Sequence, residues 1–497
     1  MAVDSLFRPP FNATQPGAYS AVDASALQGG LQPTGPFLVI VGASLGGQPN
    51  ILQRFRDPQA LKGRLRSGAG YDCARFAMGV GAGPIGFVRA GNGILQASLA
   101  LQNAGATTVV TLTSIDYGVW TNAIKVTVAA NNLITISYTD GNGVTFNEVY
   151  ACGAAATSQQ ITDCINGKRL GFNPSQYVTA AVGGGAAPCA VLAQTPLTGG
   201  NDGTSGALVA GDWTAALAAL EGEVCDMIVP ATGDATVHAQ VQTHCDSMSV
   251  PQARKERTCV VGGVLGESVA ASVTRMTSLT SRRIQLAYPG VVDFDNAGVL
   301  RTWDPFYTAA KVAAMHVTQP DAATSLIHQF VPCIDLEQVS GRYLSTAPGS
   351  DVDTLLRANV TTLTPAPGGG VWVVDSLSGW ATDEIWRDFH KTRSADVVQQ
   401  RLRTQLEALY IGKKSLNNTA AAITDSATGL LQSLKDETLI RDFGEVTVQQ
   451  GNDARTYLVT ARVLLADATK FIYITVALQP ASLATAPQAA DSAAAGA

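Results

Sequence analysis

The chain has 497 residues, a length that exceeds one hydrophobic core and favours about three domains. Apolar residues make up 46% of it and charged residues 14%, which excludes a disordered chain and suits a surface that other subunits cover. The formal net charge of −6 comes with no basic tract, so we expect no direct nucleic-acid partner.

The first residues, MAVDSLFRPPFNATQPG, contain an acid, an arginine and prolines where a signal peptide needs a continuous apolar stretch. No segment approaches the ~20 apolar residues of a membrane span. We therefore expect a protein that is made in a cytosol, has no membrane partner, and leaves the cell only as part of a particle.

Residues 1–36 predict an N-terminal arm, because their prolines and glycines resist helix formation and cannot pack a core alone. Within the arm, Ala18 to Leu27 form one candidate strand, which would need a partner sheet. The apolar run from Phe37 to Gly42 predicts a buried strand and begins the first part of the folded body, residues 37–90.

Residues 91–195 predict an inserted β-rich domain, since Thr, Val, Asn and Gly dominate their composition. Asn131-Asn132 and the segment from Asp140 to Gly143 are turn sequences, so successive hairpins in an antiparallel sheet are expected. The expected strands are 107–113, 124–128, 133–138 and 144–150.

Residues 196–365 predict an α/β domain in which strands alternate with helices. This alternation implies βαβ crossovers and a mostly parallel sheet that is covered on both faces. Asp212 is expected to cap one helix, and Asp304 with Pro305 to begin another. The expected strands are 224–229, 258–261 and 283–287, and the expected helices are 212–220, 235–248, 268–279 and 305–316.

Residues 366–466 predict a C-terminal core domain. Ser394 is expected to cap a helix that Gly412 ends, and a second helix is expected at 419–435. A strand is expected at 456–465. The first helix carries one apolar stripe, formed by Val398, Leu402, Leu406 and Leu409.

Residues 467–497 predict a C-terminal strand, Lys470 to Gln479, and a flexible alanine-rich tail. The strand could pair with 456–465 as a hairpin in its own domain, or add to the sheet of a neighbouring subunit. The residue pattern leaves both arrangements open. Alternation places four apolar residues on one face of the strand: Ile472, Ile474, Val476 and Leu478.

The predicted fold class is mixed α+β with several domains. An α/β core domain is built from N- and C-terminal parts of the chain, with an inserted β-rich domain and extended terminal arms.

Two glycine-rich stretches resemble nucleotide-binding loops without their chemistry. Gly81 to Gly86 matches GxGxxG, but Pro84 interrupts it and a strand follows where a helix would have to bind pyrophosphate. Gly42 to Gln48 lacks the lysine and hydroxyl of a phosphate loop. We interpret both as turns and expect no cofactor.

The titratable residues do not form a recognisable catalytic or metal motif. His238, His244 and Cys245 fall on one predicted helix at a spacing that does not share a face, which favours a structural cluster over a metal site. Asp293 and Asp295 are followed by a turn sequence, so a turn is favoured over a catalytic pair. No enzyme signature emerges from the sequence.

The eight cysteines include no CxxC or CxxH pair, which argues against zinc. Cys225 and Cys259 lie in apolar strands and are expected in the core. The other six are candidates for disulfides between subunits after release into an oxidising medium. They are Cys73, Cys152, Cys164, Cys189, Cys245 and Cys333.

The segment Leu197 to Gly203, LTGGNDG, resembles the L-x-GG-x-DG stretch of tail sheath proteins from contractile bacteriophages. Other pieces are similar to that family in the same order: the PGAY at 16–19, the strand at 37–42, YGVWTNAIKVTV at 117–128, YPG at 288–290, the strand at 371–375 and FIYITVAL at 471–478. Departures include Ala18 in place of valine, Asp375 to Ser378 in place of an Arg-Thr-Thr run, and the extra alanine-rich tail.

The resemblance implies a helical sleeve of stacked six-membered rings around a tail tube, which contracts to drive the tube through the host envelope for genome ejection. The implied partners are further copies of the chain, the tube protein, and baseplate and tail terminator proteins. The implied location is the virion tail, assembled in the host cytoplasm. The implied strand contacts between subunits are Tyr19, Phe471, Ile472, Ile474, Val476 and Leu478.

Two other functions remain open from the sequence. One is the sheath of a tailocin or of another contractile injection system. The other is an enzyme whose ligand binds at the carboxyl ends of parallel strands in the α/β region.

Overall fold

The computed structural model describes residues 37–141, 143–337, 343, 348–415, 419–451 and 455–470. Tyr19 and the contact residues from Phe471 to Leu478 therefore lie outside the described residues, as do the whole predicted N-terminal arm and nearly all of the C-terminal strand. The described residues contain no helix that is long and apolar enough to cross a membrane.

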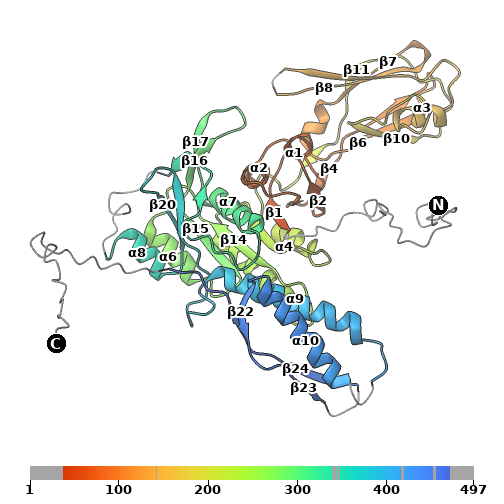
Figure 1. The fold of residues 1–497 in the computed structure, drawn as a ribbon. Coiled ribbons are helices and arrows are strands. Elements are labelled where there is room, and N and C mark those ends of the chain that lie inside the picture. The colour runs from red at the N-terminus through yellow and green to blue at the C-terminus, as the bar shows by residue number, and fades with distance from the viewer. Residues whose placement is uncertain are drawn as a thin grey trace, which may run out of the picture.

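A nine-stranded mixed sheet forms the body (Figure 1). The six central strands are parallel. At one edge β2 pairs antiparallel with β3, and at the other β21 pairs antiparallel with both β20 and β18. In order across the sheet the strands are β18 (Phe330–Val331), β21 (Val371–Asp375), β20 (Thr361–Pro365), β15 (Ile284–Tyr288), β14 (Thr258–Gly262), β13 (Met227–Pro230), β1 (Leu38–Gly42), β3 (Ile85–Arg89) and β2 (Leu52–Phe55).

Strands β1, β3, β13, β14 and β15 are buried along their whole length, as is typical of parallel strands with helices on both faces. Helices α2 and α7 pack on each other and on the central strands, and so do α4 and α5. The helices of the body are α1 (Pro58–Leu65), α2 (Ala69–Val80), α4 (Ala210–Ala218), α5 (Ala235–Met248), α6 (Val269–Thr277), α7 (Pro305–Thr318) and α8 (Asp351–Arg357).

The segment between β3 and β13 carries a second unit with its own hydrophobic core, which we call the insert (Figure 1). It has a three-stranded sheet, β10-β6-β5, and a four-stranded sheet, β11-β7-β8-β9. Its elements are β5 (Ser98–Gln102), β6 (Thr108–Ser114), β7 (Lys125–Ala129), β8 (Leu133–Thr139), β9 (Thr145–Ala151), α3 (Ser158–Ile165), β10 (Val178–Val182) and β11 (Leu192–Pro196). The short pair β4 (Ile94–Leu95) and β12 (Asn201–Asp202) lies where the chain enters and leaves the insert.

The C-terminal unit consists of two long helices and two short hairpin-like strand pairs, and it projects from the body away from the insert (Figure 1). Strand β22 pairs with β25, and β23 pairs with β24. Its elements are α9 (Phe389–Tyr410), α10 (Thr419–Asp436), β22 (Ile440–Phe443), β23 (Thr447–Gln450), β24 (Tyr457–Thr460) and β25 (Val463–Leu465). A further small sheet on the body contains β16 (Val291–Phe294), β17 (Leu300–Trp303) and β19 (Asp335–Leu336).

The mixed α+β fold class with several units is confirmed. Helix α5 has the predicted bounds, Ser268 caps α6, and α10 begins at the predicted Thr419. The predicted boundary at 365/366 falls between β20 and β21, which pair in the main sheet, so residues 371–375 belong to the body. The remaining domain boundaries stay a prediction.

Two predicted caps are wrong. Helix α9 begins at Phe389, before the predicted start, and burial of the Phe389 ring stabilises this additional first turn. Ser394 lies inside the helix, where its hydroxyl donates to the carbonyl of His390. Helix α4 begins at Ala210, and Asp212 lies in its first turn and accepts a hydrogen bond from the Val209 N–H. The predicted strand 456–465 is divided into β24 and β25.

Two histidines of α5 are buried in the body, where they are stable only as neutral rings. Burial lowers the pKa of His238 to about 4, and burial together with the neighbouring Arg257 lowers the pKa of His244 to about 4. Both rings are hydrogen bonded, His238 to the Thr232 carbonyl and His244 to Arg257. The two neutral rings contribute fully to the free energy of unfolding above about pH 6.5, the pKa of histidine in an unfolded chain. This contribution is lost as the pH falls towards 4.

We predict that acid unfolds the body through these rings. Between about pH 6 and 4, each of them should lower the free energy of unfolding by up to about 1.4 kcal/mol per pH unit. Urea unfolding at several pH values should show a shallower pH dependence in His244→Gln, because one fewer proton is taken up on unfolding. Identical slopes in the variant and the parent would contradict this assignment.

Candidate assembly sites: the insert junction and the C-terminal groove

Arg89, the last residue of β3, holds together the point where the insert joins the body. Its guanidinium is fully buried. It donates to the carbonyls of Gly47 and Tyr117 at 3.1 and 3.2 Å, and its Nη2 lies 3.2 Å from Asp202 Oδ1. The same carboxylate oxygen accepts from the Val119 N–H at 3.0 Å. One buried charge therefore binds a body loop, the entry of the insert and its exit.

The glycines of LTGGNDG allow these segments to approach closely. A Cβ on Gly200 would lie 2.4 Å from Thr121 Oγ1 and 2.6 Å from the Gly118 carbonyl oxygen. Gly203 has φ +52°, and a Cβ there would lie 1.9 Å from the Asn92 carbonyl oxygen. The motif therefore specifies backbone packing and one carboxylate, Asp202, at the junction.

A second arginine joins the insert to the body through aromatic rings. Arg66 follows α1, and its guanidinium lies over the rings of Trp120 and Tyr138, 3.2 and 4.7 Å from their centroids. Trp120 and Tyr138 meet edge to face. Burial lowers the pKa of Arg66, so the rings provide the attraction that water would otherwise supply.

We predict that Gly203→Ala destabilises the junction by roughly 2 to 4 kcal/mol, because the new Cβ meets the Asn92 carbonyl and the residue has a positive φ. Gly206→Ala in the same loop is the matched control, since no atom lies within 4 Å of its Cβ position. Thermal unfolding compares the two variants, and equal midpoints would refute the packing role of Gly203.

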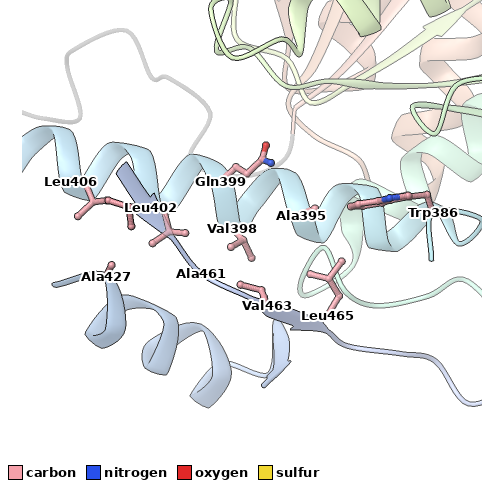
Figure 2. A pocket seen from close by; sticks show the side chains of 11 residues that line it. Trp386, Ala395, Val398, Gln399, Leu402, Leu406, Ala427, Ala461, Val463 and Leu465 are labelled. Carbon is pink, nitrogen blue, oxygen red and sulfur yellow. The ribbon is translucent and has the colours of Figure 1, made fainter. Parts of the chain in front are cut away.

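The C-terminal unit contains an open apolar groove between α9 and the strands β24 and β25 (Figure 2). Val398, Leu402 and Leu406 point from α9 towards it (Figure 2). In the opposite wall every second residue faces the groove, as in an extended chain. These residues are Val459, Ala461, Val463 and Leu465. The groove encloses about 480 Å³, and a second hollow beside Tyr410 and Tyr457 continues it.

Helix α9 is docked on the body by charged groups. Arg283 forms two bonds of 2.6 and 2.9 Å with Asp396 of α9, and both side chains are buried. Arg403 of α9 binds Glu256 at 2.6 and 2.8 Å. Burial alone would raise the pKa of Glu256, but the bonds from Arg403 outweigh it and lower that pKa. These paired hydrogen bonds fix the orientation of α9 on the body, which apolar contacts alone would not do.

We predict that Asp396→Ala weakens this docking by about 3 to 5 kcal/mol, because it leaves the Arg283 charge buried without its partner. Glu437→Ala removes a pair with Arg401 whose side chains are 46% and 48% exposed, and should cost under about 1 kcal/mol. Hydrogen exchange in α9 is the measurement. Equal protection in the two variants would contradict the prediction.

The last described residues leave the groove and return to the body. Lys470 Nζ lies 2.8 Å from Asp375 at the end of β21 and 2.6 Å from Asp388 before α9. Asp467 pairs with Lys391 of α9. We call this group of four pairs the Lys470 clasp, with the Lys391–Asp388 pair as its fourth member. The two carboxylates outweigh burial and raise the pKa of Lys470.

The candidate disulfide cysteines are all free thiols in this structure. Cys225 and Cys259 lie in the core, as expected, and five of the six candidates are buried as well. Cys333 is partly accessible, and burial raises its pKa to about 11. Bridges between subunits stay a prediction, and Cys333 could form one without exposure of the interior.

The other motifs have structural roles. Gly81 ends α2 in the left-handed conformation, and the chain continues into β3, as the turn interpretation of GxGxxG requires. His238 and His244 contact different neighbours, and no group of three or more metal-ligating residues occurs among the described residues. Asp295 accepts from the N–H groups of Ala297 and Val299 in the turn after β16, whereas Asp293 pairs with Lys311.

Sequence reasoning missed Arg66, Arg89 and the Lys470 clasp. Arg89 and Asp202 are 113 residues apart, and no periodicity links them. Asp202 is the aspartate of LTGGNDG, and a carboxylate in such a motif was the one sequence signal that pointed to a buried cationic partner.

Residues 381–479 match the family described as the phage tail sheath C-terminal domain. The tail sheath protein of Bacillus phage SP01 is 26% identical over 258 residues, which cover 51% of this chain and 43% of that protein. The chain is a relative of phage tail sheath proteins. This confirms the predicted resemblance to tail sheath proteins of contractile bacteriophages. The aligned part spans less than half the length of that sheath protein.

Solved sheath structures share the fold. A sheath tail protein from Listeria innocua superposes with a TM-score of 0.63 at 18% identity, covering 90% of this chain and 95% of that one. The helical sheath of the anti-feeding prophage in its contracted state gives a TM-score of 0.52 at 11% identity, covering 93% of this chain and 99% of that one. At these identities the likeness establishes a sheath fold and leaves the residues of assembly to be argued from this chain.

Proposed function

We propose that this chain is the structural subunit of a contractile tail sheath. Its copies polymerise as stacked hexameric rings around a tail tube, and contraction of the sleeve drives the tube through the host envelope for genome ejection. The partners in this proposal are other copies of the chain, the tube protein, and baseplate and tail terminator proteins. The protein then belongs to the virion tail, is assembled in the host cytoplasm, and acts without catalysis.

The observation that supports this proposal best is the open groove in the C-terminal unit. Strands β24 and β25 each have one strand partner among the described residues, so each keeps an edge for a further strand. The half-buried apolar side chains of the groove match an incoming strand with apolar residues on one face. The chain's own residues 467–470 lead to the body instead, where the Lys470 clasp holds them.

These features favour strand exchange over the hairpin alternative. We propose that the segment following Lys470, with Phe471, Ile472, Ile474, Val476 and Leu478, or the segment around Tyr19, occupies the groove of another copy. Main-chain hydrogen bonds would then join subunits, and the apolar alternation would set the register.

A tailocin or another contractile injection system is the runner-up function, and the likeness to the anti-feeding prophage sheath supports it. Capsid and terminase genes beside the coding sequence would select the phage, because only an infectious particle packages a genome. An α/β enzyme is the remaining alternative, and it would require a substrate or nucleotide bound to the purified protein.

We predict that donor and acceptor defects can be separated. Truncation after Lys470 keeps the clasp and removes the donor, whereas Val459→Asp places a charge in the groove and removes the acceptor. Each protein should stay folded and form no tubes in negative-stain micrographs. A mixture of the two should form pairs in sedimentation, because each supplies what the other lacks.

Leu458→Asp is the matched control, since Leu458 is the neighbouring residue and its side chain is 61% exposed away from the groove. This variant should polymerise like the parent. Tubes from the truncated chain would refute the donor role, and tubes from Val459→Asp would refute the acceptor role. A parent that never polymerises, even with a tube protein, would contradict the sheath function itself.

A further inference from the structure

Three of the eight cysteines share the small hydrophobic core of the insert. Cys152 follows β9, Cys164 lies in the last turn of α3, and Cys189 precedes β11. All three are free thiols with side chains at most 7% exposed.

Burial raises the pKa of Cys152, and the neighbouring Cys164 thiol raises it further, so these two thiols interact. A single atom, Arg169 Nη1, confirms how near the two residues lie, because it is 3.2 Å from the Cys152 carbonyl oxygen and 3.5 Å from Cys164 Sγ. Cys189 is linked to Cys152 through backbone groups, since its N–H donates to Asn132 Oδ1 and the Asn132 carbonyl accepts from the Cys152 N–H. The Cys164 sulfur itself shares the Arg169 partner with Cys152, which favours Cys152 and Cys164 as the pair.

We propose that Cys152 and Cys164 form a disulfide within the chain when the protein meets a low-molecular-weight disulfide in an oxidising medium. The thiolate of one cysteine attacks the small disulfide, forms a mixed disulfide and releases one small thiol. The thiolate of the other cysteine then attacks the protein sulfur of that mixed disulfide and releases the second small thiol. The protein loses two electrons and two protons, and the small disulfide is reduced to two thiols.

Cys152 is the entry point for the oxidant. Its side chain is 4% exposed, whereas that of Cys164 is 0% exposed, and the three residues that follow Cys152 are exposed. Burial raises the pKa of Cys152 to about 12, so little thiolate is present at neutral pH and the exchange is slow. Slow oxidation agrees with a bridge that forms after assembly rather than during folding.

The second close pair, Cys245 and Cys259, is a poorer candidate. Burial and the neighbouring Cys245 thiol raise the pKa of Cys259, but both side chains are 0% exposed and Cys259 lies within a central strand of the nine-stranded sheet. An oxidant reaches them only if the main core opens. They serve as an internal comparison for the insert pair.

The bridge would join the two sheets of the insert. Helix α3 packs on β10 and β6 of the three-stranded sheet, and Cys152 ends the outer strand of the four-stranded sheet. In the reduced form these layers meet through apolar contacts, the stacked rings of Tyr150 and Phe172, and the bonds of Arg169. A covalent link there limits opening of the insert and leaves the body unchanged.

The experiment compares the full-length protein after incubation with oxidised glutathione and after incubation with a reductant. Free thiols are alkylated, the protein is digested without reduction, and the peptides are identified by mass spectrometry. We expect linked peptides containing Cys152 and Cys164, lighter than their sum by two hydrogens. Hydrogen exchange in α3 and β9 should slow in the oxidised parent, and this slowing should be absent in Cys164→Ser.

Cys225→Ser is the matched control, because it removes a buried thiol of the body and should leave the linked peptides and the slower exchange intact. Three outcomes overturn the proposal: eight alkylated cysteines after oxidation, a link from Cys152 to Cys189, or a disulfide that joins Cys152 or Cys164 to a second copy of the chain. The result on the parent does not depend on a variant that folds. It is also independent of polymerisation, so its failure leaves the sheath proposal standing.

Discussion

The buried guanidinium of Arg89 is the constraint on which the relation of insert and body depends. A buried charge requires acceptors, and here two carbonyls and one carboxylate from segments far apart in the chain bind its two Nη atoms, whereas its buried Nε has no partner among the described residues. LTGGNDG supplies one partner of this arginine, Asp202, while Gly200 and Gly203 let the chain approach Gly118 and Asn92 closely.

The C-terminal unit follows a different physical logic. Its helix α9 is fixed to the body by buried and bidentate ion pairs, while the strands across from it leave an apolar groove exposed. The charged side of α9 finds its partners within the subunit. In the proposed assembly, a strand from a further copy covers the apolar side. A unit with this asymmetry can join neighbours without being loosened from its own body.

The sequence predicted most elements of the body, because the apolar runs and caps of a parallel α/β sheet are local signals. Helix α5, found with its predicted bounds, and α6, found within the predicted helix 268–279, show this. Helix α3 was missed although Thr157 and Gln160 form a capping box, because the glycines and alanines around it obscured the signal. The start of α9 was wrong because Ser394 satisfies its hydroxyl within the helix.

The candidate sites were less accessible from sequence. The apolar stripe of α9 was predicted, and Val398, Leu402 and Leu406 of that stripe line the groove. The contacts of Arg66, Arg89 and Lys470 depend on the tertiary fold, since their partners lie tens to more than a hundred residues away. Periodicity reports which face of an element is buried and carries no information on which distant residue it meets.

The Lys470 clasp has a mechanical consequence. A pull on the chain beyond Lys470 reaches the subunit at the junction of β21 and α9, through ion pairs loaded together, and not through the short strands β24 and β25. The force then enters the nine-stranded sheet directly, because β21 is one of its strands. In the proposed assembly, a load on the terminal segment of one copy would therefore reach its body at this clasp, apart from the strand pairs that the proposal assigns to another copy.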